Sequence, residues 1–158
     1  TPELPFVPSQ EAVGEVVAVG EHVDPTMIGT RVLGPTLFRE QKGGLAEACL
    51  MSADMAFAIP AEMSGEEAAG FYIPYQTAWI ALVRRANITA ADTVLVLGAS
   101  GSSGCAAVQL AKAKGATVIA VAGGPEKSKF CKSIGADEVI DHRREDITER
   151  AKALTGRI

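Results

Sequence analysis

The chain has 158 residues, of which 47% are hydrophobic and 22% charged, and its formal net charge is -4. This composition is typical of a folded globular protein rather than a disordered one, and the acidic balance with few aromatic residues gives no sign of a nucleic-acid-binding surface. No apolar run approaches the roughly 20 residues of a membrane span, so we expect no membrane partner, and the charge balance gives no reason to expect a nucleic-acid partner. Three cysteines without a C-x-x-C pair argue against a disulfide framework, so we expect a cytoplasmic protein.

Short β-type runs dominate the first third of the chain. Apolar or β-branched stretches separated by turn residues cover residues 11–20, 29–34, 45–51 and 56–60. Gly14 lies inside the first run and predicts a bulge or a close backbone approach there. Because no helical pattern separates these runs, we expect part of a small barrel or sandwich.

A helical region follows, with a clear start and an expected interruption. Ser64 and Glu67 have the spacing of a capping box, which predicts a helix beginning near Ala68. Pro74 is expected to break this helix, leaving unpaired backbone groups near Thr77 before the helical pattern resumes at residues 79–86. Such a break is either a packing feature or a point of ligand contact, and the local sequence leaves both interpretations open.

The most informative segment is the glycine-rich turn after residue 97. Residues 93–97 form an apolar, β-branched run typical of a buried strand, residues 105–114 are rich in helix formers, and residues 116–122 form a second apolar strand. The turn places small residues at the three spaced positions of a dinucleotide-binding fingerprint, with serines between them: Ala99, Ser100, Gly101, Ser102, Ser103 and Gly104. This order predicts a pyrophosphate site at the helix N-terminus. The alternative is a structural glycine turn in another kind of α/β unit.

The number of strands is smaller than a complete domain of this type requires. A doubly wound dinucleotide domain normally carries about six strands, and here we count three. Since the chain also opens without Met and stops just after a helix that Asp146 is expected to cap, we expect a piece of a longer protein. Strand order 3-2-1 would leave residues 93–97 at an exposed apolar edge, which predicts association or missing partner strands.

Several segments together resemble a known family. They are Leu4-Pro5-Phe6-Val7-Pro8 with Glu11 and Gly14, Gly43-Gly44-Leu45-Ala46-Glu47, Thr77-Ala78-Trp79, the turn GASGSSG with Gln109 and Lys112, Gly135-Ala136-Asp137, and Ile140-Asp141-His142-Arg143. In this order they are similar to the zinc-independent quinone oxidoreductase (zeta-crystallin-like) branch of the medium-chain dehydrogenase/reductase superfamily.

The resemblance implies an α/β fold in two parts. We expect a partial GroES-like catalytic domain at residues 1–65, followed at residues 66–158 by a partial Rossmann NADP-binding domain, the first half of a doubly wound parallel sheet. Family members bind the cofactor between these domains, with Thr77 matching a residue near the nicotinamide and the amides around Ser102 and Ser103 matching those that face the pyrophosphate. Ser102 and Ser103 replace the usual Gly-Val pair, so their side chains would crowd the cofactor or hydrogen-bond to it.

Charge at the end of the second strand favours NADPH over NADH. An NAD site needs a carboxylate at this point to bind the ribose 2′-hydroxyl, whereas this strand ends in Ala122, Gly123 and Gly124. The resemblance assigns contact with the 2′-phosphate to Lys127, and His142 stands where the family often has a tyrosine with the same role. The alternative is that Lys127, His142 and Arg143 are ordinary solvated surface residues.

Zinc is not expected. Zinc-binding members of the superfamily have G-H-E where this chain has Ser9-Gln10-Glu11, and an amide is a poor zinc ligand. We therefore expect a zinc-independent enzyme that transfers hydride from NADPH to a quinone or an α,β-unsaturated carbonyl and is a homodimer in its full-length form. This chain alone is expected to be inactive, and its catalytic residues are unknown. The alternatives are a non-catalytic, crystallin-like NADPH-binding protein and an enoyl reductase module of a larger enzyme.

Overall fold

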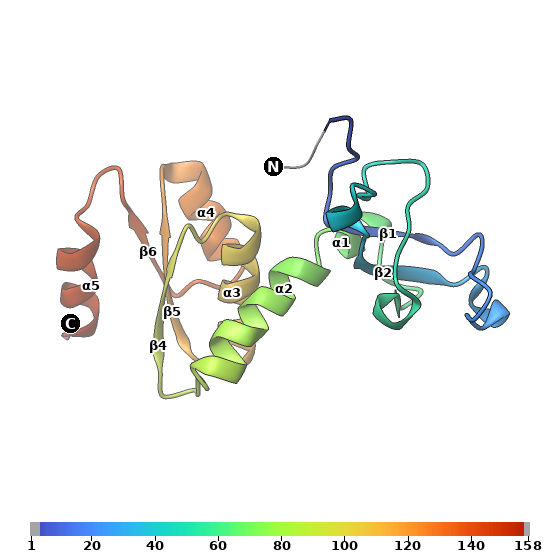
Figure 1. Ribbon diagram of the computed structural model, residues 1–158. Coiled ribbons are helices and arrows are strands. Elements are labelled where there is room, and N and C mark those ends of the chain that lie inside the picture. Colours follow the sequence, from blue (N-terminus) through green and yellow to red (C-terminus); the bar gives the residue numbers. More distant parts are fainter. Residues whose placement is uncertain (1–3, 157–158) are drawn as a thin grey trace. The chain divides into compact units, whose positions relative to one another are not determined.

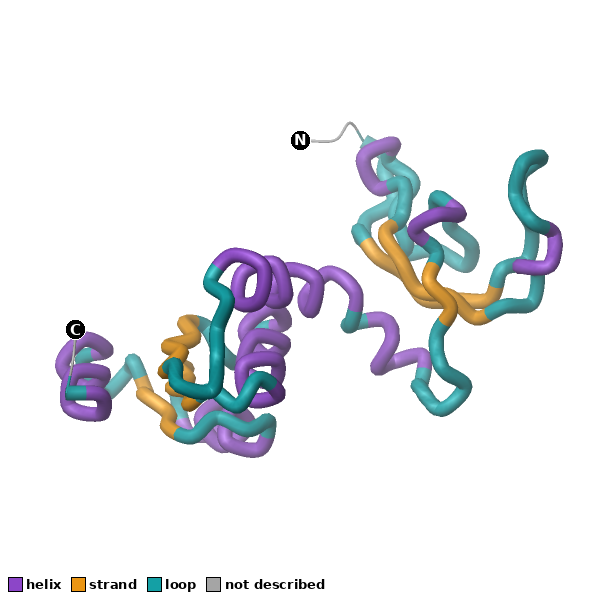
Figure 2. Tube along the Cα trace, turned by 90° about the horizontal axis from the view of Figure 1, so that it is seen from below, coloured by secondary structure: helices purple, strands orange, loops and turns teal. Residues whose placement is uncertain are grey.

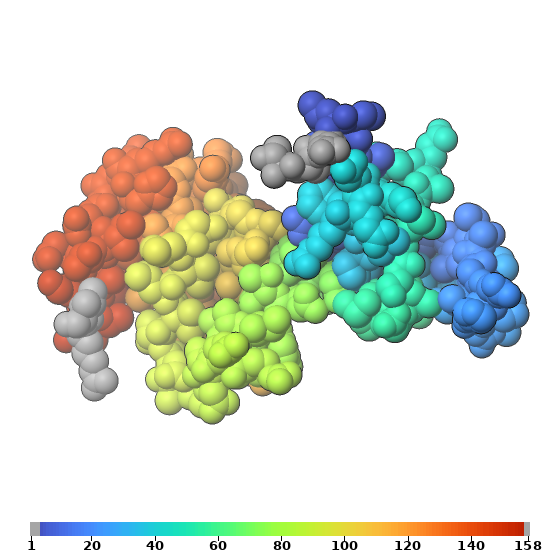
Figure 3. Space-filling model, viewed as in Figure 1, coloured from blue at the N-terminus to red at the C-terminus, as the bar shows by residue number. Residues whose placement is uncertain are grey.

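The computed structural model describes residues 4–156, which fall into two compact units divided after Ile73 (Figure 1). In the space-filling view the first unit runs from blue to green and the second from green to red (Figure 3). Residues 1–3 and 157–158 lie outside the described residues. The expectation that the chain is a piece of a longer protein depended in part on these two ends. Within the described residues, no helix combines the length and the apolarity needed to cross a membrane.

The first unit contains a small antiparallel sheet. Its strands β1 (Glu11–Glu15), β2 (Arg31–Pro35) and β3 (Phe57–Ala58) lie in the order β1-β2-β3. Gly14 pairs with Val32 in an uninterrupted ladder, and a Cβ at Gly14 would meet nothing within 4 Å. The expected bulge or close approach at Gly14 is therefore wrong, and the first strand ends at Glu15 rather than at residue 20.

The expected strand at residues 45–51 is also wrong. The Leu45 amide donates to the Pro8 carbonyl at 3.0 Å, and the Leu50 carbonyl accepts from the Leu37 amide at 3.1 Å, so this segment is held by single bonds instead of a ladder. Among the described residues its sheet-like contact is one isolated bridge between Thr36 and Met51. In the described part of this unit, 3-10 helices occupy the connections: η1 (Pro25–Met27), η2 (Phe38–Glu40) and η3 (Ala53–Met55).

The capping box at Ser64 is confirmed. Helix α1 (Gly65–Ala69) begins with the Glu67 amide donating to the Ser64 hydroxyl at 3.1 Å, while the Ser64 amide donates to the Glu67 carboxylate at 3.0 Å. This helix packs against β1 and therefore lies in the first unit.

The expected helix break at Pro74 is wrong. Helix α2 (Tyr72–Ala78) starts only two residues earlier, so Pro74 lies in its first turn, where a backbone N–H has no helical acceptor to lose. The helix continues through Thr77 and passes directly into the π-helix η4 (Trp79–Arg85), which ends with the Ala86 amide donating to the Ala81 carbonyl at 2.9 Å.

The second unit is a parallel sheet with helices on both faces (Figure 2). Strands β4 (Thr93–Leu97), β5 (Thr117–Ala122) and β6 (Glu138–Asp141) lie in the order β4-β5-β6. They alternate with helices α3 (Ser102–Ala113), α4 (Pro125–Ser133) and α5 (Ile147–Thr155), and Figure 1 shows α3 and α4 on one face and α5 on the other. This is the strand-helix-strand order predicted from the glycine turn and its neighbours.

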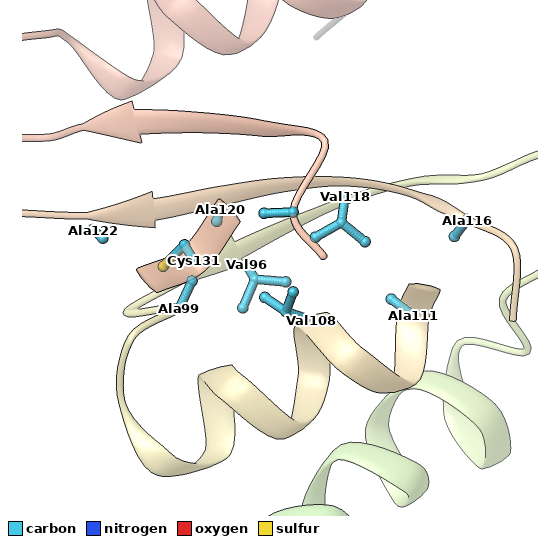
Figure 4. Close-up of a cluster of buried hydrophobic side chains, with 10 residues drawn as sticks. Val96, Ala99, Val108, Ala111, Ala116, Val118, Ala120, Ala122 and Cys131 are labelled. Atoms are coloured by element: carbon cyan, nitrogen blue, oxygen red, sulfur yellow. The ribbon is translucent and has the colours of Figure 1, made fainter. Parts of the chain in front are cut away.

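Strand β5 supplies the core of this unit on both of its faces. Val118, Ala120 and Ala122 point toward α3 and α4, where they pack with Val108 of α3 and Cys131 of α4 (Figure 4). The intervening Ile119 and Val121 pack with Ile140 and with Ala151 of α5. The period-2 alternation of a strand thus buries an entirely apolar run, as expected for a central strand of a parallel sheet.

Strand β4 forms an open edge, as predicted from the strand order. Within the described residues it pairs only with β5. Leu95 and Leu97 pair with Ile119 and Val121 and are 41% and 67% exposed. Leu95 and Leu97 therefore pair with core residues of β5, yet their own side chains are exposed at the edge of the sheet.

Candidate functional site

The first part of the candidate site is the turn that joins β4 to α3. Gly98 adopts φ +62°, a conformation that favours glycine. The turn is closed by the Gly101 amide donating to the Gly98 carbonyl at 2.9 Å and is tied to the sheet by the Ala99 amide donating to the Val121 carbonyl at 3.0 Å. Ala99 is fully buried in the core cluster, so a small residue is required at this first fingerprint position.

Gly104 allows the helix to approach the strand closely. A Cβ at this position would overlap the Gly98 carbonyl oxygen and would lie 2.8 Å from the Cα of Ala99. Both obstacles are backbone atoms, which cannot rotate away. The predicted role of the third small residue in helix–strand packing is therefore visible in the geometry.

The first turn of α3 presents backbone donors without a side-chain cap. Gly101 is the N-cap residue and makes no side-chain capping bond, and the first helical bond is the Cys105 amide donating to the Gly101 carbonyl at 2.7 Å. The amides of Ser102, Ser103 and Gly104 precede that bond and so have no acceptor within the helix. Ser102 and Ser103 are exposed, while Ser100 is half-buried in the turn. Together with the helix dipole, these donors can bind an anionic group.

The second part of the candidate site lies where β5 and β6 end. A Cβ on Gly123 would lie 2.7 Å from the His142 Nε2 and 3.0 Å from the Arg143 Nε. Two side chains that can carry positive charge therefore lie directly over Gly123, and both residues are exposed. The structure thus brings Gly123 and His142 together although 18 positions separate them in the sequence.

Lys127 is placed less closely. It lies in the first turn of α4, three residues after Gly124, and is exposed. Among the described residues, no hydrogen bond or ion pair joins Lys127 to Gly123 or His142. A flexible lysine at this point can contribute charge to the same strand end without a fixed geometry.

Asp141 is a residue of this region to which the sequence analysis gave no role. It ends β6, directly opposite Ala122 of β5 in the sheet. Its Oδ1 accepts from the Gly124 amide at 2.9 Å and from the Arg143 amide at 3.1 Å. The bond from Gly124, followed by that from Arg143, holds the pKa of Asp141 below its ordinary value. An Asp whose side chain accepts from the amide two residues later is a recognisable turn signal, so the second bond could have been expected from the sequence.

Thr77 is the second-last residue of α2, just before η4, and is exposed. Because the helix is continuous here, Pro74 does not create a break that would expose backbone groups to a ligand. The role of Thr77 near a nicotinamide therefore depends on the family resemblance alone.

No group of three or more His, Cys, Asp or Glu side chains in the described part of the chain is arranged to hold a metal ion. Gln10, which the family resemblance places at the position of the histidine of zinc-binding members, is exposed just before β1.

Comparison with known families agrees with both units. The alcohol dehydrogenase GroES-like domain matches residues 1–79, half of the chain, and the zinc-binding dehydrogenase family matches residues 104–158. An antiparallel GroES-like sheet followed by a parallel Rossmann-like sheet with a glycine turn defines a class of two-domain dehydrogenases. The chain belongs to this class, the medium-chain dehydrogenase/reductase superfamily.

Quinone oxidoreductases are prominent among the similar proteins. The chain is 44% identical over 155 residues to a quinone oxidoreductase-like protein 2 homologue of Nematostella vectensis and 37% identical to the quinone oxidoreductase of Sus scrofa. These alignments cover 98% of this chain but 41% and 46% of the two relatives. The chain therefore spans less than half the length of these relatives.

Solved structures give the same picture. A mycobacterial protein complexed with NADPH superposes with a TM-score of 0.85 at 33% identity, over 98% of this chain and 48% of that protein. The Escherichia coli quinone oxidoreductase complexed with NADPH superposes with a TM-score of 0.79 at 32% identity, over 99% of this chain and 47% of that protein.

Proposed function

We propose that this chain contributes the adenosine and pyrophosphate part of an NADPH site. The free amides of Ser102, Ser103 and Gly104 would bind the pyrophosphate, and His142, Arg143 and Lys127 would bind the 2′-phosphate. The observation that carries the choice of NADPH is the pair of side chains over Gly123, at the end of a strand that has no carboxylate of its own. In an NAD site this strand end supplies an acidic side chain, which would repel a 2′-phosphate.

The geometry of the turn fits a dinucleotide. Gly101 is exposed at the start of α3, so the backbone can come close to a phosphate, and Gly104 keeps the helix against the strand. Thr77 is proposed to lie near the nicotinamide, on the strength of the resemblance.

The proposed reaction is the zinc-independent transfer of hydride to a quinone or an α,β-unsaturated carbonyl compound. Bound NADPH would supply the hydride, and the residues of this chain would bind and orient the cofactor. Support comes from relatives that carry the name quinone oxidoreductase. The replacement of a zinc-ligating histidine by Gln10 supports chemistry without zinc.

The cofactor assignment is tested by measuring the Kd values of NADPH and NADH by isothermal titration calorimetry. We expect the protein to prefer NADPH, and Arg143→Gln to weaken NADPH binding by about tenfold while changing NADH binding by less than about twofold. Arg85→Gln is the matched control, because Arg85 is an exposed arginine at the end of η4 and belongs neither to β6 nor to the turn after β5. A preference for NADH in the unmodified protein would overturn the assignment.

The reaction is tested separately on the full-length protein, by following the loss of the reduced-nicotinamide absorbance of NADPH in the presence of a simple benzoquinone. Tight NADPH binding without quinone-dependent oxidation would favour a non-catalytic NADPH-binding protein instead of a reductase.

A further inference from the structure

The carboxylate of Asp141 links the ends of two neighbouring strands. Asp141 is the last residue of β6, and its Oδ1 reaches the amide of Gly124 in the turn after β5 at 2.9 Å. The same oxygen accepts from the Arg143 amide at 3.1 Å. One carboxylate oxygen therefore holds both backbone segments that border the proposed 2′-phosphate site.

The side chains that face this site extend from those same two segments. His142 and Arg143 lie over Gly123, and the backbone of His142 is further tied to β5 by its amide donating to the Ala122 carbonyl at 3.1 Å. Gly124 adopts φ +91°, a conformation that lets its amide turn toward Asp141. Loss of the Asp141 acceptor would release the Gly124 and Arg143 amides together, and the orientation of the Arg143 side chain would no longer be fixed from its backbone.

Asp141 is itself held in place on its other sides. Its own amide donates to the Glu145 carboxylate at 3.1 Å, and its Oδ2 lies 3.8 Å from the Arg144 Nε. The Asp141 side chain is 16% exposed. With Oδ1 occupied by two backbone donors and Oδ2 beside a guanidinium group, the carboxylate is committed to the protein rather than presented to a ribose hydroxyl.

We propose that Asp141 is a positioning residue for recognition of the 2′-phosphate: it fixes the Gly124 and Arg143 backbone so that His142 and Arg143 are held over Gly123. This inference rests on the proposed function, because it assigns a residue to the 2′-phosphate end of the proposed NADPH site. Asp141 touches no part of the cofactor in this role and acts through its neighbours.

The test compares 2′,5′-ADP with 5′-AMP, two fragments that differ in the 2′-phosphate. Calorimetry on the protein, Asp141→Ala and Asp141→Asn gives the ratio of the two Kd values for each. We expect Asp141→Ala to weaken 2′,5′-ADP binding by about tenfold and 5′-AMP binding by less than about twofold, since two backbone donors lose their acceptor. Asp141→Asn keeps an oxygen acceptor and is expected to restore the ratio to within about threefold of the original value.

Asp146→Ala is the matched control. It removes another carboxylate that accepts a backbone amide, from Glu149 at 2.9 Å, but this carboxylate caps α5 and does not touch the Gly123–Gly124 turn. We expect this variant to leave the Kd ratio unchanged. Amide hydrogen exchange at Gly124 is a second measurement, and it should accelerate in Asp141→Ala and remain slow in Asp141→Asn.

Three results would overturn the inference, and they are distinguishable. An unmodified protein that binds both fragments equally would contradict the proposed NADPH site and the role of Asp141 with it. A preference that survives in Asp141→Ala would contradict the role of Asp141 alone. Equal weakening of both fragments in Asp141→Ala would show that Asp141 does not act selectively on recognition of the 2′-phosphate.

Discussion

Replacement of Gly104 by alanine tests whether the close approach of α3 to β4 depends on the glycine. The new Cβ would overlap the Gly98 carbonyl oxygen and lie 2.8 Å from the Ala99 Cα, whereas ordinary contact begins at 3.4 Å. The helix start must therefore move outward by at least 0.6 Å, the difference between these two distances. Ala99 is fully buried, so the opposing backbone has no free space into which it could move.

The energetic consequence follows from this displacement. Overpacking of this kind costs about 1–3 kcal/mol, and the upper part of that range applies because the obstacles are backbone atoms. The higher helix propensity of alanine returns at most about 1 kcal/mol. We therefore expect the free energy of unfolding of the second unit to fall by about 2 kcal/mol, which lowers the Tm of a unit of this size by roughly 10 °C.

The assay is urea or thermal unfolding followed by tryptophan fluorescence. Trp79 is the single tryptophan of the chain and belongs to the second unit, where the Lys114 Nζ lies 5.6 Å from the centroid of its ring, so the signal reports on that unit. Ser103→Ala is the control in the same helical turn and should change the free energy of unfolding by less than about 0.5 kcal/mol. An unfolding midpoint for Gly104→Ala equal to that of the unmodified protein would refute the packing argument.

Three further changes have defined outcomes. The Lys112 ammonium, followed by the Val118 amide, holds the pKa of Asp137 below its ordinary value of 3.8, so ionised Asp137 stabilises the fold above that pH and this contribution is lost as the pH falls below it. The difference in the free energy of unfolding between the protein and Asp137→Asn, measured by urea unfolding, should therefore shrink on acidification through this range. A pH-independent difference would contradict the assignment. Ser64→Ala removes the hydroxyl that accepts a hydrogen bond from the Glu67 amide and should destabilise α1 by about 1 kcal/mol. The expected sign is faster hydrogen exchange at the Glu67 amide, and unchanged exchange would show that the capping box does not stabilise the helix. Leu97→Lys places a charge on the open β4 edge, where Leu97 is 67% exposed, and should reduce any concentration-dependent association of the protein in sedimentation velocity. Equal association of the unmodified protein and the variant would exclude the β4 edge as the surface through which the protein associates.

The parallel unit was predictable because its signals are local. The strand β4, the glycine turn and α3 follow one another in the sequence, and the Ser64 and Asp146 caps depend on residues three positions apart. The antiparallel unit was less predictable, since short strands are decided by pairing partners distant in the sequence. Residues 45–51 have an apolar composition compatible with a strand, yet their backbone bonds go elsewhere.

The candidate site divides in the same way. The proposed pyrophosphate cradle is contained in residues 98–104, so its spacing and the strand and helix on either side of it supported the prediction, and the missing carboxylate after β5 could be read directly from Gly123 and Gly124. Which groups lie around Gly123 depends on the pairing of Ala122 with Asp141, because parallel strands bring their carboxyl ends together regardless of the helix between them. Only the tertiary structure therefore decided that His142 covers Gly123 and that Asp141 accepts the Gly124 amide.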